Sequence, residues 1–305
     1  GFGFDTILHH AAEQLVVEQG AVTPKTLYYL ALYVVVPFFA RVFDLSVAAV
    51  HQPLTIILLG LSTPVVLVLA LRALFPRMTS DRVLVIALLF LTVPYPHLVM
   101  TTPWGLAYGT TFLTLLSSAR AVITRERSQW TLAGACALFT LTLHPLAGIP
   151  LVFFLAVLAC SLTKRHILLA SMAVLGSLGV PLAFVVHSML SSQFRLSLHL
   201  PTLQDFTTLF DLGISLTTRF SPLLDVAYFV FFNGHLVLLA LAAIGFLFFF
   251  SSFSLAKKMS EVGSRSFFWS CFLSATFIAI SGILTSTVLR FDSLAGFEQQ
   301  DYAKR

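Results

Sequence analysis

The stretch LTIILLGLSTPVVLVLALRALF, residues 54–75, carries the strongest information on the fold of this chain, because it is mostly apolar and Arg72 is its only charged residue. An α-helix needs about 20 such residues to cross the hydrocarbon core of a bilayer. Comparable apolar stretches follow at 83–99, 105–123, 130–144, 146–162, 167–187, 223–250 and 267–289. The sequence therefore predicts an all-α fold, a polytopic membrane helix bundle with about eight spanning helices.

The overall composition supports a membrane protein. Hydrophobic residues make up 58% of the chain and charged residues only 10%, whereas a soluble domain carries about 25% charged residues. The net charge of +5 comes from short loops between apolar stretches, so the expected partner is the lipid bilayer and not a nucleic acid. The chain begins with Gly1, and we expect no signal peptide in it. We expect residues 1–305 to form a single transmembrane domain that is a fragment of a longer chain.

The basic residues predict the orientation, because loops rich in Lys and Arg stay on the cytoplasmic side. They cluster in the loops after the first, third, fifth and seventh apolar stretches. These residues are Arg72, Arg77, Arg82, Arg120, Arg125, Arg127, Lys164, Arg165, Lys257, Lys258 and Arg265. We therefore expect the loops marked by Arg77, Arg125, Lys164 and Lys257 to be cytoplasmic.

This orientation divides the chain into four parts. They are an external loop with surface helices at 1–53, a six-span core at 54–187, an external loop at 188–222, and two spans with an external tail at 223–305. Residues 1–25 are then external. The apolar segment 27–43 is interpreted as a surface or re-entrant helix that does not cross. The alternative is that 27–43 spans, which would put residues 1–25 inside.

Residues 5–19 have the pattern of an external amphipathic helix. Phe4, Leu8, Ala11 and Leu15 form one stripe, and Asp5, His9 and Glu13 form a polar ridge at four-residue spacing on another face. In the functional interpretation Asp5 is a general base or one ligand of a divalent cation, with His9 or His10 nearby. In the structural interpretation Asp5 caps the helix, and His9 and Glu13 are solvated neighbours.

The run FDTILHHAAEQLVVEQG, from Phe4 to Gly20, resembles the first external loop of the catalytic subunit of oligosaccharyltransferases. More broadly it is similar to GT-C glycosyltransferases, which use lipid-linked sugar donors. The resemblance implies Asp5 as the catalytic residue, in acceptor activation or metal binding. The loop 99–104 contains no acidic residue and the chain has no Trp-Trp-Asp motif. These departures argue against peptide glycosylation and against metal dependence, so no cofactor is assigned and a divalent cation at Asp5 stays an alternative.

The resemblance also implies a site for a polyprenyl-phosphate sugar donor at the external face. Its substrate-binding candidates are His9, His10, Arg195, Arg219 and Arg290. Arginine supplies a planar donor fork that suits the phosphate of a lipid carrier. The alternative for the three arginines is contact with lipid headgroups at the interface.

Two functions without catalysis compete with the transferase. A multi-pass transporter or lipid-handling permease would show internal repeats and interrupted helices in matching halves, and the sequence shows no such repeat. A scaffold subunit of an envelope complex would need no acid–histidine ridge. The discriminating feature is whether the segment around Asp5 and the loop 188–222 face one cavity.

Overall fold

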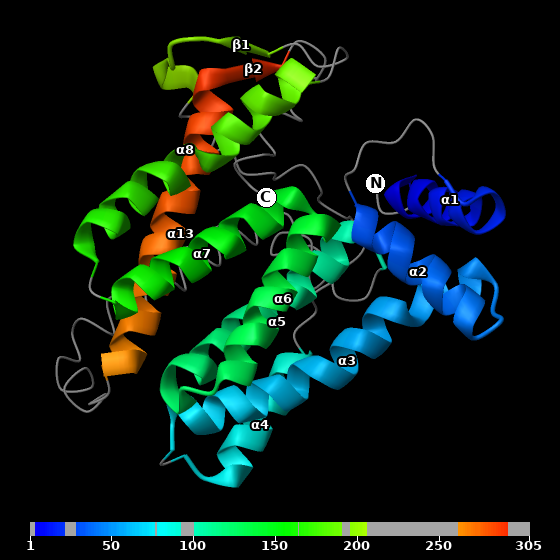
Figure 1. The fold of residues 1–305 in the computed structure, drawn as a ribbon, viewed down its shortest axis with the longest axis horizontal. Coiled ribbons are helices and arrows are strands. Elements are labelled where there is room, and N and C mark those ends of the chain that lie inside the picture. Colours follow the sequence, from blue (N-terminus) through cyan, green and yellow to red (C-terminus); the bar gives the residue numbers. More distant parts are fainter. Residues whose placement is uncertain are drawn as a thin grey trace, which may run out of the picture. The chain divides into compact units, whose positions relative to one another are not determined.

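The computed structural model describes residues 4–21, 29–76, 78–92, 101–163, 165–190, 196–205 and 262–291. The chain divides into two compact units, and each is described by itself (Figure 1). Unit 1 comprises Gly1–His166 and Ser266–Cys271, and unit 2 comprises Ile167–Arg265 and Phe272–Arg305.

The described elements are helices and two short strands. In unit 1 the helices are α1 (Phe4–Gln19), α2 (Leu30–Val42), α3 (Val47–Leu74), α4 (Ser80–Thr92), α5 (Pro103–Thr124), α6 (Arg127–Leu143) and α7 (Pro145–Leu162). Helix α8 (His166–Leu190) and the strands β1 (Leu196–Leu198) and β2 (Leu289–Phe291) belong to unit 2, apart from His166. Helix α13 (Val262–Val288) has segments in both units.

Among the described residues, five helices are long and apolar enough to cross a membrane, which supports a multi-pass membrane protein. They are α3, α5, α7, α8 and α13. The prediction of about eight spans exceeds these five. Helix α6 has only 17 residues, the described part of α4 has 13, and the predicted span 223–250 lies outside the described residues.

Helix α2 is too short to cross a bilayer. It has 13 residues, which cover about 20 Å at 1.5 Å per residue, whereas the hydrocarbon core is about 30 Å thick. Its length favours the non-spanning interpretation of segment 27–43. Its described start at Leu30 lies inside the predicted range.

Helix α3 begins earlier than the predicted span. The helix starts at Val47, seven residues before the predicted span at 54. The Ser46 side chain caps it by accepting a hydrogen bond from the Ala49 N–H at 3.2 Å. Pro53 lies inside the helix, where it removes one backbone bond without ending it.

Small side chains let α5 approach its neighbours closely in unit 1. It packs against α3, α6 and α7. Its buried positions include Gly105, Ala107, Gly109, Thr110, Thr114, Ser117, Ser118 and Ala121. Leu59 of α3 lies against Gly109, and the Thr140 hydroxyl of α6 donates to Thr110 Oγ1 at 2.7 Å. Such small residues and hydroxyl contacts are how membrane helices associate where the solvent is as apolar as their surfaces.

Unit 2 adds a short strand pair, which the sequence did not predict, to the mostly helical fold. Strand β1 pairs with β2 in antiparallel register, with Ser197 opposite Arg290. The His199 N–H then donates to the Val288 carbonyl at 3.0 Å. The described start of the predicted external loop 188–222 is therefore the end of α8 followed by a strand. Residues 206–222 of that loop lie outside the described residues.

The close contact of α6 with α7 gives a stability prediction. A Cβ on Gly148 of α7 would collide with the backbone of Leu141 in α6, which cannot move aside as a flexible side chain can. We expect Gly148→Ala to lower the free energy of unfolding by about 1–3 kcal/mol, measured as a lower Tm in detergent.

The matched control is Gly134→Ala in α6, because a Cβ there meets no atom within 4 Å. Alanine favours helix over glycine, so this variant should keep or raise the Tm. Equal Tm values for the two variants would contradict the tight α6–α7 contact.

Candidate functional site

Helix α1 turns the face that carries His9 and Glu13 toward the rest of unit 1. Glu13 is 0% exposed and Ala12 3%, whereas Ile7 is 67% exposed and Leu15 36%. The structural interpretation, in which Glu13 is a solvated neighbour of His9, does not hold for Glu13. The reason is that α2 and α3, which pack on α1, bring their own polar groups to meet this face.

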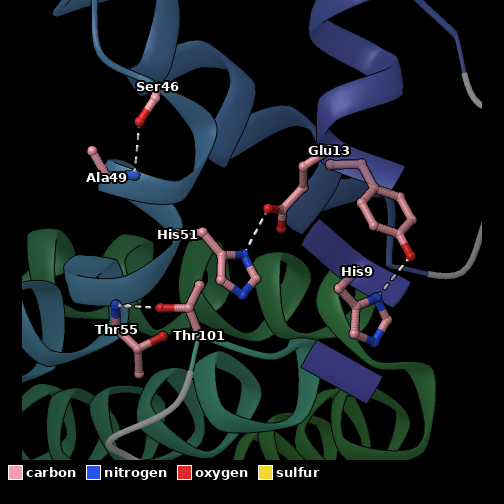
Figure 2. Close-up of polar contacts among 8 residues, drawn as sticks. His9, Glu13, Ser46, Ala49, His51, Thr55 and Thr101 are labelled. Carbon is pink, nitrogen blue, oxygen red and sulfur yellow. Dashed lines mark hydrogen bonds and ion pairs between the residues drawn. The ribbon is translucent and has the colours of Figure 1, made fainter. Parts of the chain in front are cut away.

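Glu13 forms a buried hydrogen bond with a histidine of α3. Its Oε2 lies 2.6 Å from Nδ1 of His51, and both side chains are nearly inaccessible to solvent (Figure 2). Burial raises the pKa of Glu13 above its usual value, and the hydrogen bond and charge of His51 oppose that rise, as does the charge of His10. The pair joins the surface helix to the start of the first spanning helix.

His10 completes a cluster of three titratable side chains. Its ring packs edge-on against the His51 ring, with the centroids 5.6 Å apart. Glu13 Oε1, His51 Nε2 and His10 Nε2 are all buried, and none has a hydrogen-bond partner among the described residues. We call Glu13, His51 and His10 the polar cluster.

His9 points into a second set of contacts beside the polar cluster. Its Nδ1 lies 2.8 Å from the Tyr33 hydroxyl (Figure 2), and its ring packs edge-on against Tyr29 at 5.2 Å. The ring centroids of Tyr29 and His144 are 5.6 Å apart. The centroid of the His144 ring lies 4.3 Å from that of Trp104. Burial raises the pKa of Tyr33, which keeps its hydroxyl protonated.

These contacts gather at one end of the spanning helices of unit 1. His51 lies near the start of α3, Trp104 at the start of α5, and His144 between the end of α6 and the start of α7. The Thr55 N–H also donates to Thr101 Oγ1 here, at 3.1 Å (Figure 2).

The basic residues gather at the opposite helix ends. Arg72 is in the last turn of α3, and Arg125 follows the end of α5. Arg120 forms a partly exposed ion pair with Glu126 at 3.4 Å. Helices α3 and α5 thus have the polar side chains near their starts and the basic residues at their ends. Arg77, Lys164 and Lys257 lie outside the described residues.

The structure brings together only part of the predicted site. Asp5 lies in the first turn of α1, which begins at Phe4, so its backbone is inside the helix and not at the cap. The side chain of Asp5 lies outside the described residues, as do Arg195 and Arg219. Arg290 is exposed in β2 of unit 2. His9 and His10 are the predicted site residues that meet other polar groups.

Sequence reasoning missed His51, Tyr33 and Thr101. His51 stands three residues before the apolar stretch that begins at 54, and nothing in its spacing links it to Glu13. The only available signal was an ionisable side chain at the edge of a span, which is a functional candidate by default.

Within the described part of the chain, no group of three or more His, Cys, Asp or Glu side chains could hold a metal ion. No protein-family model, curated protein or solved structure matches the chain.

The Glu13–His51 pair generates a prediction for stability. Glu13→Ala leaves His51 Nδ1 buried without its acceptor, so we expect a loss of about 1–3 kcal/mol in the free energy of unfolding. The measurement is the Tm of the purified protein in detergent.

Glu18→Ala is the matched control on the same helix. Glu18 is exposed and accepts a hydrogen bond from Gln14, a contact of about 0.2–0.5 kcal/mol. A Tm for Glu13→Ala no lower than that of Glu18→Ala would show that the pair does not hold α1 in place.

Proposed function

We propose that this protein is a membrane glycosyltransferase of GT-C type. It transfers a sugar from a polyprenyl-phosphate-linked donor to an acceptor at the outer membrane face. The observation that carries the proposal is the inward-facing polar ridge of α1, where Glu13 and His10 meet His51. The same helix carries the run that resembles the first external loop of such transferases.

The arrangement of unit 1 supports this proposal over a passive surface helix. A helix that only covered the membrane surface would solvate its charged side chains. Here Glu13 is buried against His51. Buried ionisable groups at membrane depth are costly to keep, and in such proteins they are commonly functional.

The proposed topology has about eight spans. The loops marked by Arg77, Arg125, Lys164 and Lys257 are cytoplasmic, and residues 1–25 and 188–222 are external. This orientation follows from the basic residues at the helix ends opposite the polar cluster. It puts the polar cluster on the face where lipid-linked sugar donors are used.

The proposed sugar transfer is carried out by polar side chains that position the acceptor and stabilise the leaving phosphate. Asp5 orients or deprotonates the acceptor hydroxyl, with His9 and His10 at the substrate. Arg195, Arg219 and Arg290 hold the phosphate of the donor as it leaves, which is electrostatic stabilisation of developing charge. The reaction is proposed to be metal-independent, because the loop 99–104 lacks acidic residues.

Replacing Asp5 tests the transferase. Membranes containing the full-length protein are supplied with tritiated sugars on short synthetic polyprenyl phosphates, and transfer to endogenous acceptors is measured. We expect Asp5→Asn to lower the transfer rate by about 10²–10⁴-fold, with the amount of inserted protein unchanged.

Glu18→Gln is the control, because this exposed carboxylate lies on the same helix and outside the proposed site. Its transfer rate should equal that of the wild type. Full activity of Asp5→Asn would remove Asp5 from the mechanism. An absence of transfer by the wild type, with uptake or flipping of a labelled lipid instead, would favour the transporter or permease.

A further inference from the structure

We propose that His51 is the proton acceptor of the transfer reaction and that Glu13 is its positioning residue. The inference rests on the proposed function and deepens it. In this proposal His51 of α3 takes the proton of the acceptor hydroxyl. Asp5 then only orients that hydroxyl. Neither His51 nor Glu13 belongs to the site that the sequence predicts.

The first step of the argument is the geometry of the imidazole. The Nδ1 of His51 lies 2.6 Å from Glu13 Oε2. When Glu13 is ionised its carboxylate can only accept hydrogen bonds, and in that state His51 Nδ1 is the donor. The lone pair then lies on Nε2, on the other side of the ring. A carboxylate that fixes the tautomer of a histidine and stabilises the imidazolium is the arrangement by which hydrolases prepare a general base.

The second step is the unmet hydrogen-bonding capacity of the polar cluster. Glu13 and His51 are 0% and 3% exposed, and Glu13 Oε1, His51 Nε2 and His10 Nε2 are buried without a partner among the described residues. Buried polar atoms without partners destabilise a fold. Three of them in one cluster suit the hydroxyl groups of an acceptor.

The third step is the place of the polar cluster relative to Asp5. Asp5 and Glu13 are eight residues apart on α1, about 12 Å along the helix axis at 1.5 Å per residue. A phosphate-linked sugar can fill a separation of this size. Helix α1 thus provides one orienting carboxylate near its start, and the Glu13–His51 pair lies two turns further along.

The proposed step balances as follows. His51 Nε2 takes the proton of the acceptor hydroxyl as the acceptor oxygen forms a bond to the anomeric carbon of the sugar. The bond between that carbon and the phosphate oxygen breaks, and polyprenyl phosphate leaves with the electron pair. The resulting imidazolium is stabilised by Glu13, and it later returns its proton to solvent.

The experiment uses membranes with the full-length protein and the tritiated polyprenyl-phosphate sugars described above. His51→Gln should lower kcat by at least about 100-fold and leave the KM for the donor unchanged. Glu13→Gln keeps an oxygen that can accept from Nδ1 but loses the charge that stabilises the imidazolium. It should lower kcat by a smaller factor, again with the donor KM unchanged.

Two further variants separate catalysis from folding. Gln52→Ala changes the exposed residue next to His51 and should keep the wild-type kcat. Glu13→Asp keeps the charge and should recover part of the activity that Glu13→Gln loses. All variants are compared at equal amounts of monodisperse protein after extraction in detergent.

A wild-type kcat in His51→Gln, beside inactive Asp5→Asn, would overturn this inference and leave the proposed function intact. A rise in donor KM with kcat unchanged would make His51 a binding group and would also overturn it. If the wild type transfers no sugar from any donor, the proposed function fails and the inference fails with it.

Discussion

A polypeptide backbone in lipid has no water to bond, and unit 1 depends on this constraint. Every crossing segment must satisfy its own N–H and C=O groups, so it is a helix, and the helices must then associate without a hydrophobic driving force. Helix α5 meets that need with glycine, alanine, serine and threonine at its buried positions. The Thr140–Thr110 hydroxyl contact adds a directional link that van der Waals packing alone does not provide.

The same constraint explains why the buried side chains of the polar cluster contact one another. In an apolar environment an unpaired carboxylate is strongly unfavourable, so Glu13 needs a partner. His51 supplies it from near the start of α3, where the chain enters the bundle. The surface helix α1 is thereby joined to the end of the bundle that also carries Trp104 and His144. The basic residues Arg72 and Arg125 lie at the opposite ends of α3 and α5.

Helix α1 shows what the periodicity of a sequence can predict and what it cannot. Four-residue spacing correctly placed His9 and Glu13 on one face of a helix, and the helix forms at Phe4–Gln19. Periodicity does not tell which face is turned to the protein. His9 and Glu13 join Ala12 on the face turned to the protein, because α2 and α3 present Tyr33 and His51 to the helix. The short strands of unit 2 escaped prediction for a related reason, since each has only three residues and is stabilised by its partner.

The sequence by itself determined the class of the protein, because long uncharged apolar stretches have few folded solutions other than membrane helices. It also predicted the separation of the basic loops from the other helix ends. Only the tertiary structure decided that Glu13 pairs with His51, 38 residues away, and that α3 begins at its Ser46 cap. These features depend on contacts between segments distant in the chain, and local spacing carries no information about such contacts.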